Sequence, residues 1–195
     1  RVPTQWTEGD GLPSGEINAI LPDISKGVVY IGTDSGLYTL DLHTNLISAV
    51  SETVDSGEIT VLFKDKNSNI WVGGWYQLSR LAPDGIWDHF NSGKPFTENF
   101  EFVSDISQDS IGGLWIATYG DGLYLHDGSR WSQFLPENTG QKLPSAFIST
   151  IQIGPADEVW VGTQESGAAL YDGQDWKRLG SQSGLLHPNI TDLYI

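Results

Sequence analysis

Four short polar segments of the chain together provide aromatic and acidic side chains. They lie between apolar runs, at 33–36 (TDSG), 73–77 (GGWYQ), 118–122 (TYGDG) and 163–167 (TQESG). The candidate ligand-binding residues in them are Trp75, Tyr76, Tyr119, Asp34, Asp121 and Glu165. Aromatic rings stack on the apolar faces of sugars, and carboxylates accept hydrogen bonds from hydroxyl groups. If the segments share one surface, they predict a site for a carbohydrate or another small polar ligand.

A purely structural role of the same residues remains open. Loop tips are normally polar, and aromatic rings in loops shield the packing beneath them. For the three carboxylates this explanation is favoured over ligand binding. For Trp75 and Tyr76 the two explanations are balanced, because both residues stand where the pattern shared by the other segments is interrupted.

Patterns that would indicate catalysis are missing from the sequence. The histidines stand at unrelated positions without metal-ligand spacing: His43, His89, His126 and His187. No serine lies in a nucleophile-elbow motif, and the chain has no cysteine for thiolate chemistry. Asp105 and Asp192 alone are too weak a signal for a cation site. We therefore predict a protein that is not an enzyme, with no catalytic residue, metal ion or cofactor.

The charge and hydropathy of the chain exclude two classes of partner. Its 195 residues include 10 basic and 25 acidic side chains, which gives a formal net charge of −15. Nucleic acids and anionic membrane surfaces are bound mainly through clustered Lys and Arg. No apolar run approaches the roughly 18 residues of a membrane-spanning helix. We expect no nucleic-acid partner and no membrane contact from this segment itself.

The apolar runs between the polar segments form a repeat. The same position of the run is aromatic each time: Tyr30, Trp71, Trp115 and Trp160. The steps of 41, 44 and 45 residues between these positions lie in the range of blades and other repeat arrays. A second, shorter run keeps the same period and opens at Ile17, Ile59, Val103, Ile148 and Ile190.

Each repeat divides into four short strands. In the third repeat these are 103–107, 114–118, 122–127 and 130–134, separated by Gly, Asp and Ser at the turns. The second strand is continuously apolar, as expected of a strand buried on both faces, whereas the fourth is more polar. Antiparallel strands that run from a dry interior to a wetter outside, with this period, describe the blades of a β-propeller.

We therefore predict an all-β fold, with 1–195 forming one partial β-propeller domain. Four complete four-stranded blades are expected at about 17–50, 59–90, 103–134 and 148–179. An extra outer strand is expected around Trp6, and an extra inner strand of a fifth blade at 190–195. Because an unpaired inner edge favours aggregation, we expect the chain to belong to a larger propeller. Two chains that complete each other would also satisfy the pattern.

Three further features of the repeat have an expected role. The four aromatic positions should lie in the core, because large rings supply most of the burial in thin sheets. The second residue of each inner strand is small and polar and is expected to line a central channel: Asn18, Thr60, Ser104, Ser149 and Thr191. The long connections 91–102 and 135–147 are candidates for ligand or partner contacts. They carry Lys94, Phe96, Phe100 and Glu101.

The repeat resembles the two-component regulator propeller repeat. The resemblance rests on YIGTDSGLYTLD (30–41), LWIATYGDGLYLHDG (114–128) and VWVGTQESGAALYDG (159–173). The second repeat departs from it, since WVGGWYQLSRLAPDG (71–85) lacks the threonine and the Gly-Leu pair. Its connection between the second and third strands is therefore expected to differ from the others.

Repeats of this family occur in extracytoplasmic sensor regions of bacterial hybrid histidine kinases and in related surface proteins. The resemblance implies a non-catalytic sensing or binding module, periplasmic or extracellular, with a small polar ligand such as an oligosaccharide at its rim. Two alternatives remain open. One is a polysaccharide lyase or glycoside hydrolase, since propellers host both and carboxylate pairs are plentiful. The other is a scaffold for protein partners.

Overall fold

The computed structural model describes residues 5–13, 15–50, 57–90 and 102–195. In these ranges the chain forms four antiparallel sheets of four strands each, together with three short 3₁₀ turns. This confirms the predicted all-β fold and its four four-stranded blades. We number the sheets as blades 1 to 4 in chain order.

The strands of each blade follow one another along the chain. Blade 1 contains β1 (Ile17–Asp23), β2 (Val28–Thr33), β3 (Gly36–Asp41) and β4 (Ile47–Ala49). Blade 2 contains β5 (Ile59–Lys64), β6 (Ile70–Gly74), β7 (Gln77–Leu81) and β8 (Trp87–His89). Blade 3 contains β9 (Val103–Gln108), β10 (Leu114–Thr118), β11 (Leu123–His126) and β12 (Trp131–Phe134). Blade 4 contains β13 (Ile148–Ile153), β14 (Val159–Thr163), β15 (Ala168–Tyr171) and β16 (Trp176–Leu179).

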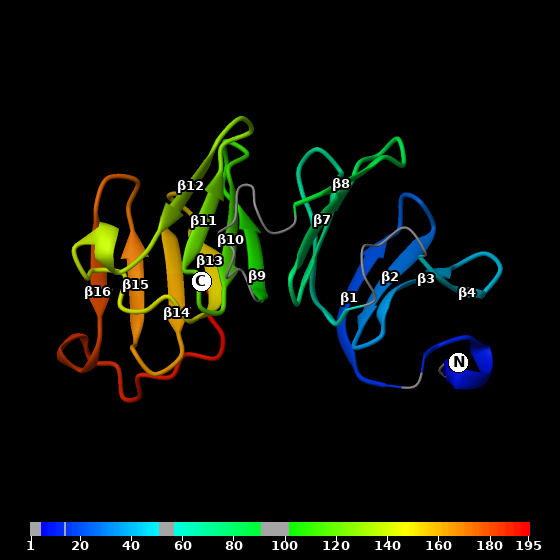
Figure 1. Ribbon diagram of the computed structural model, residues 1–195, viewed down its shortest axis with the longest axis horizontal. Coiled ribbons are helices and arrows are strands. Elements are labelled where there is room, and N and C mark those ends of the chain that lie inside the picture. Colours follow the sequence, from blue (N-terminus) through cyan, green and yellow to red (C-terminus); the bar gives the residue numbers. More distant parts are fainter. Residues whose placement is uncertain (1–4, 14, 51–56, 91–101) are drawn as a thin grey trace.

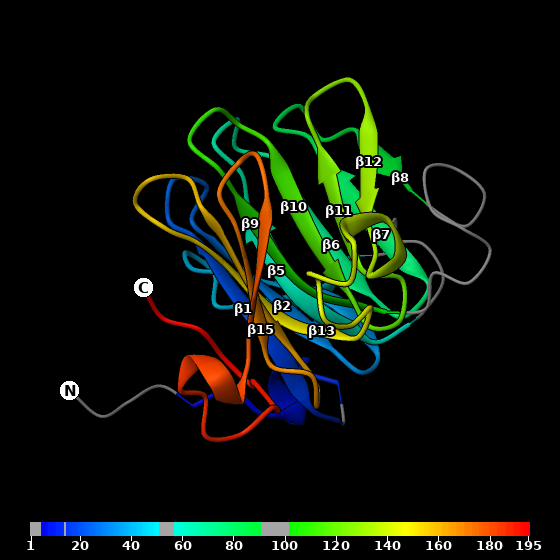
Figure 2. The ribbon, with the colours of Figure 1, turned by 90° about the vertical axis from the view of Figure 1, so that its left-hand side faces the viewer.

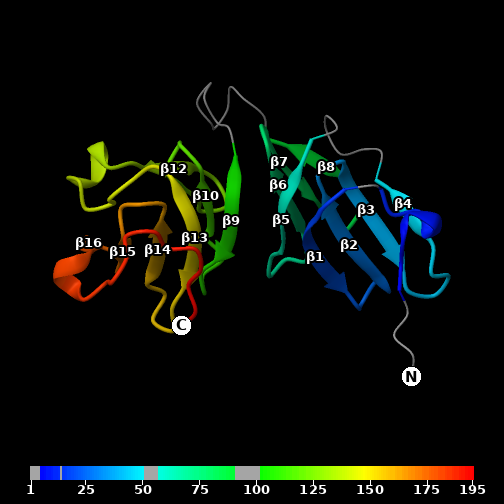
Figure 3. The same ribbon diagram turned by 90° about the horizontal axis from the view of Figure 1, so that it is seen from below.

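The blades stand side by side in chain order (Figure 1). Their inner strands β1, β5, β9 and β13 contact one another in succession and lie in the middle of the molecule, while β4 and β16 lie at opposite ends (Figure 3). Figure 2 shows the sheets overlapping when the molecule is viewed from the side of blade 4. The 3₁₀ turn η1 (Glu8–Asp10) lies at the entry to blade 1, η2 (Glu137–Thr139) lies between blades 3 and 4, and η3 (Ser181–Ser183) follows blade 4.

Each inner strand contains a β-bulge at the same position of the repeat. The bulge leaves the second residue out of the ladder in every blade: Asn18, Thr60, Ser104 and Ser149. In two blades this residue bonds to the chain one repeat further on, because Thr60 Oγ1 donates to the Val103 carbonyl of β9 at 2.6 Å and Ser149 Oγ donates to the Ile190 carbonyl. These two hydroxyls thus link successive repeats, where the sequence predicted the lining of a channel.

The blades approach closely where the second strand carries glycine. A Cβ atom on Gly32 would lie 2.6 Å from Ile59 Cγ2, and one on Gly73 would lie 2.7 Å from Val103 Cγ1. Real Cβ atoms do not come so near a neighbour, so the missing side chain is what lets the next inner strand pack against the sheet.

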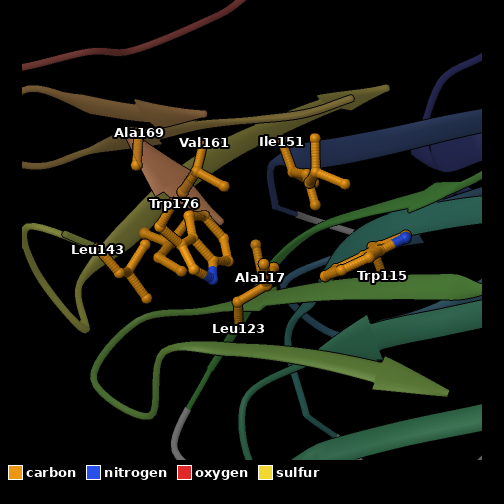
Figure 4. Close-up of a cluster of buried hydrophobic side chains, with 10 residues drawn as sticks. Trp115, Ala117, Leu123, Leu143, Ile151, Val161, Ala169 and Trp176 are labelled. Carbon is orange, nitrogen blue, oxygen red and sulfur yellow. The ribbon is translucent and has the colours of Figure 1, made fainter. Parts of the chain in front are cut away.

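The hydrophobic core lies between the blades. Figure 4 shows the cluster between blades 3 and 4, which includes Trp115 and Leu123 of blade 3 and Val161 and Trp176 of blade 4. Leu143, from the connection that joins the two blades, completes the cluster and is fully buried. Burial of such large apolar side chains is the main stabilising contribution in sheets this thin.

The aromatic anchors are buried in three of the four blades. Tyr30, Trp71 and Trp115 are 5%, 2% and 3% exposed, as the sequence predicted. Trp160 is only half-buried, and so differs from that prediction. Each buried anchor packs against the following blade, and the described chain contains no blade after blade 4 to cover Trp160 in the same way.

The two additional strands predicted at the ends do not form in the described residues. Residues 190–195 have no second strand beside them, and without a partner ladder their backbone is not assigned as a strand. Ile190 nevertheless takes the place of the first residue of an inner strand, since its N–H donates to the Thr163 carbonyl at 3.0 Å. Trp6 precedes η1, which Thr7 and Asp10 cap with a hydrogen bond of 2.8 Å between Thr7 N and Asp10 Oδ2.

Candidate functional site

The connections after the second strands meet the next blade at one rim. Trp75, which follows β6, forms a β-bridge with Phe102, the residue before β9. Tyr119, which follows β10, forms the equivalent bridge with Phe147, the residue before β13. The Tyr119 N–H also donates to the Phe102 carbonyl at 2.9 Å. Backbone hydrogen bonding therefore connects blades 2, 3 and 4 along this rim.

In blades 3 and 4 a threonine hydroxyl forms a hydrogen bond across the connection between the second and third strands. Thr118 Oγ1 donates to the Gly122 carbonyl at 2.7 Å and accepts from the Asp121 N–H at 3.1 Å. Thr163 Oγ1 donates to the Gly167 carbonyl at 2.6 Å in the same way. The threonine side chain thus forms a hydrogen bond with the backbone of the connection. This bond explains why the repeat carries a threonine followed by a glycine.

Blade 2 lacks this threonine and turns differently, as the sequence predicted. Gly74 pairs with Gln77 across a two-residue turn, in which Tyr76 adopts a left-handed φ of 54°. The turn projects its two aromatic side chains outward, leaving Trp75 40% and Tyr76 63% exposed. The interruption of the repeat therefore creates an exposed aromatic pair.

Five aromatic side chains form a continuous row along the rim, which we call the aromatic strip: Tyr76, Trp75, Phe102, Tyr119 and Phe147. Successive ring centroids are 6.0, 5.1, 6.2 and 5.1 Å apart. The last three contacts are edge-to-face, the arrangement that the ring quadrupoles favour. Phe147, at the far end of the strip, is 48% exposed.

The structure brings together three of the six predicted site residues. Trp75, Tyr76 and Tyr119 all belong to the aromatic strip. The sequence interpretation included the connections 91–102 and 135–147 as candidates for ligand or partner contacts, but it did not single out Phe102 and Phe147 within them. Their signal was a bulky apolar residue directly before an inner strand, where the equivalent positions in blades 1 and 2 hold glutamate.

The three predicted carboxylates lie in different surroundings. Asp34 accepts a hydrogen bond from the neighbouring Ser35 hydroxyl at 3.1 Å. Asp121 shares a connection with Tyr119, and its Oδ2 accepts from the Tyr124 hydroxyl at 3.1 Å. Glu165 is exposed, follows Gln164 and lines a cavity at the end of blade 4. Their role as ligand contacts stays a prediction.

Hydrogen bonds also cross between blades beside the strip and at the inner strands. The Tyr119 hydroxyl donates to Gln164 Oε1, which joins blades 3 and 4 at the rim. On the inner strands, Asp105 Oδ2 accepts from the Ile151 N–H at 2.9 Å and from Thr150 Oγ1 at 3.1 Å. Burial raises the pKa of the Asp105 carboxyl, and the charge of Asp192 raises it further.

Several candidate features cannot be placed at the rim. Lys94, Phe96, Phe100 and Glu101 lie outside the described residues. Within the described ranges, no three His, Asp or Glu side chains are grouped so that they could hold a metal ion. In the same ranges, no helix is long and apolar enough to cross a membrane.

The blade that provides Tyr119 also carries the family signature. Residues 97–120 match the family model described as "Two component regulator propeller". The chain contains a two-component regulator propeller repeat. The matched residues of this repeat include β9, β10 and two members of the aromatic strip, Phe102 and Tyr119. The comparison with curated proteins gave no match.

Solved structures with similar folds include propeller domains of bacterial sensors. The extracellular domain of a proposed one-component system from B. thetaiotaomicron aligns with a TM-score of 0.70 and 23% identity, over 86% of this chain and 23% of that one. The extracellular domain of a proposed hybrid two-component system from the same organism gives 0.66 and 20%, over 82% and 22%. This chain thus spans less than a quarter of either domain.

A third similar structure is a streptogramin B lyase, with a TM-score of 0.65 and 13% identity, over 88% of this chain and 57% of that one. At such identities the likeness concerns the fold alone. The first two structures are extracellular domains of their own proteins.

Proposed function

We propose that this chain is a non-catalytic recognition module of an extracytoplasmic bacterial sensor, and that its aromatic strip binds a small polar ligand such as an oligosaccharide. The observation that carries the proposal is the strip itself. Trp75, Tyr76 and Phe147 keep 40%, 63% and 48% of their surface exposed although burial would favour each of them. Exposed aromatic rings gathered in one row indicate a binding surface.

The surroundings of the strip suit a hydroxylated ligand. The rings offer π faces to the C–H groups of a sugar, whose positive hydrogens are attracted by the ring quadrupole. The Tyr119 hydroxyl and the Gln164 amide provide hydrogen-bonding groups beside the rings, and the Asp121 carboxylate lies in the same connection as Tyr119. Apolar faces with a few polar groups that fix orientation are the usual composition of a small-molecule site.

The sensor assignment is supported by the family repeat and by the similar structures. The repeat at 97–120 belongs to a family named for two-component regulators, and two similar folds are extracellular domains of proposed sensor systems. From this we infer that the parent protein places the propeller outside the cytoplasm and reports ligand binding to signalling domains.

The proposal is tested by titrating a panel of oligosaccharides into the protein in a calorimeter. Trp75→Ala should weaken binding about tenfold or more, because it removes a large, exposed ring from the contact surface. Tyr194→Ala is the matched control, since Tyr194 is 99% exposed and lies outside the strip. Absence of any glycan binding, or equal affinities for Trp75→Ala and the wild type, would contradict the proposal.

A cavity at the end of blade 4 favours an enzyme as the second candidate. It has a volume of about 610 Å³, and its lining includes a carboxylate, a cation and an imidazole from Glu165, Arg178 and His187. The imidazole and the carboxylate could transfer protons as general base and acid, and the cation could stabilise the negative charge that develops in a lyase reaction. Turnover of a polysaccharide that is abolished by His187→Ala would favour this candidate over the binding module.

A further inference from the structure

The aromatic strip extends beyond the dimensions of a site for one sugar. Its rings come from three blades, since Tyr76 and Trp75 follow β6, Tyr119 follows β10, and Phe147 precedes β13. The centroid steps of 5.1 to 6.2 Å are comparable with the length of one pyranose unit. Adjacent rings can therefore contact adjacent units of a chain.

The connectivity of the strip also favours an extended ligand over a compact one. Its two β-bridges hold Trp75 beside Phe102 and Tyr119 beside Phe147 through the backbone, so the row is part of the folded framework. The two most exposed rings stand at its two ends, Tyr76 in blade 2 and Phe147 before blade 4. A ligand that uses both ends must cross blade 3.

The charge around the strip indicates whether an extended ligand would be charged or uncharged. None of its five members is cationic. Asp121 lies two residues after Tyr119, and Glu165 follows Gln164, the hydrogen-bond partner of the Tyr119 hydroxyl. The whole chain has a formal net charge of −15. A polyanion would be repelled by this field, whereas an uncharged chain would not.

We propose that the aromatic strip is a row of subsites for one extended, uncharged oligosaccharide that crosses blades 2 to 4. This proposal rests on the proposed function and adds the length and charge of the ligand. Trp75 and Tyr76 bind one end of the chain, and Phe147 binds units that only a longer chain provides. Phe147 is thus the residue that makes the affinity depend on chain length.

The test measures dissociation constants for a neutral oligosaccharide series from the monomer to the hexamer, with the wild type, Trp75→Ala and Phe147→Ala. Wild-type affinity should rise with length until the strip is covered and then level off. Phe147→Ala should weaken the longest ligands about fivefold to tenfold and leave the shortest unchanged, whereas Trp75→Ala should weaken both. Phe147→Leu should behave like Phe147→Ala, because it keeps an apolar side chain without the ring face.

Distinct outcomes would overturn the two proposals. Affinity independent of length, or equal losses for short and long ligands in Phe147→Ala, would refute the row of subsites while the binding function stands. Preference for a sulfated or uronic-acid glycan, or for a cationic peptide, would refute the proposal that the ligand is uncharged. Failure of every glycan to bind would refute the proposed function as well. Thermal unfolding midpoints that match the wild type show that the variants are folded.

Discussion

At the scale of single residues, a buried carboxylate at the end of the inner strand organises each of the first three blades. Asp65 Oδ2 accepts from Trp71 Nε1 at 2.9 Å, and Asp109 Oδ2 accepts from Trp115 Nε1 at 3.0 Å. Asp109 Oδ1 also accepts from the backbone N–H of the turn, which explains why SQDSIGGLW (107–115) carries an aspartate there. The carboxylates of Asp65 and Asp109 thus each fix both a turn and an anchor ring.

Blade 1 uses its carboxylate in another way, because its anchor is a tyrosine without an indole N–H. Asp23 is fully buried and accepts from Lys64 Nζ of blade 2 at 2.8 Å. The hydrogen bond from Lys64 holds the pKa of Asp23 below its ordinary value of 3.8, with a smaller contribution from the Ser25 hydroxyl. The pair therefore fastens blade 1 to blade 2.

Lys64→Met should lower the free energy of unfolding by about 2 kcal/mol at neutral pH, because it leaves Asp23 charged and without its partner. Since the folded-state pKa of Asp23 lies below the unfolded value, its contribution is present above pH 3.8 and is lost as the pH falls below that value. Urea titrations at neutral and acidic pH should show a smaller loss on acidification in the variant. Lys177→Met, on the exposed face of β16, is the control; equal behaviour of the two variants would contradict the role of the pair.

At the scale of elements, the fold depends on how closely one inner strand approaches the preceding sheet. The bulge frees the second residue of each inner strand from the ladder, and in β5 it lets the Thr60 hydroxyl reach the Val103 carbonyl of the next blade. The glycine two residues after each of three anchors provides the room for this approach. The same few contacts therefore recur at successive blade interfaces.

Gly73→Ala should lower the free energy of unfolding by about 1–3 kcal/mol through overpacking, because its Cβ would lie 2.7 Å from Val103 Cγ1. The added Cβ would also lie 2.7 Å from Val61 Cγ1, so the same change should cost less in a background that carries both Val61→Ala and Val103→Ala. A double-mutant cycle from urea titrations measures the difference. Gly180→Ala is the matched control, since a Cβ there meets no atom within 4 Å. An identical cost in both backgrounds would show that the contact is not responsible.

At the scale of the whole molecule, blade 1 has an uncovered apolar face. A groove of about 350 Å³ on this face is lined by apolar side chains that include Ile20, Ile31 and Ile47. By their place in the ladder, Ile20 corresponds to Ile151 and Ile47 to Trp176, which are buried between blades 3 and 4. The face therefore has the composition of a blade interface, but the described residues place no blade against it.

The comparison of Ile20→Thr with Ile151→Thr tests this equivalence. Ile151 is 3% exposed, and its replacement should lower the free energy of unfolding by about 2–3 kcal/mol. Ile20 is 62% exposed, and its replacement by Thr should change the free energy of unfolding by less than about 0.5 kcal/mol. Equal losses in urea titrations of the 195-residue chain would mean that a second copy covers the face in solution.

The sequence alone determined the repeat, the four strands of each blade and most of the core. These features follow from local polarity: a continuously apolar strand must be buried on both faces, and Gly, Asp and Ser mark the turns between strands. The altered connection of blade 2 was equally visible, because one threonine and one Gly-Leu pair were missing from a regular pattern.

Only the tertiary structure decided which aromatic residues meet at the rim. Phe102 and Phe147 belong to the strip because the rim of each blade contacts the residue that precedes the following inner strand. Likewise, Trp160 has the sequence of a core anchor but is half-buried, since its burial depends on a neighbouring blade. Local patterns specify a blade, whereas contacts between residues about one repeat apart depend on the packing and bulges that set one blade against the next.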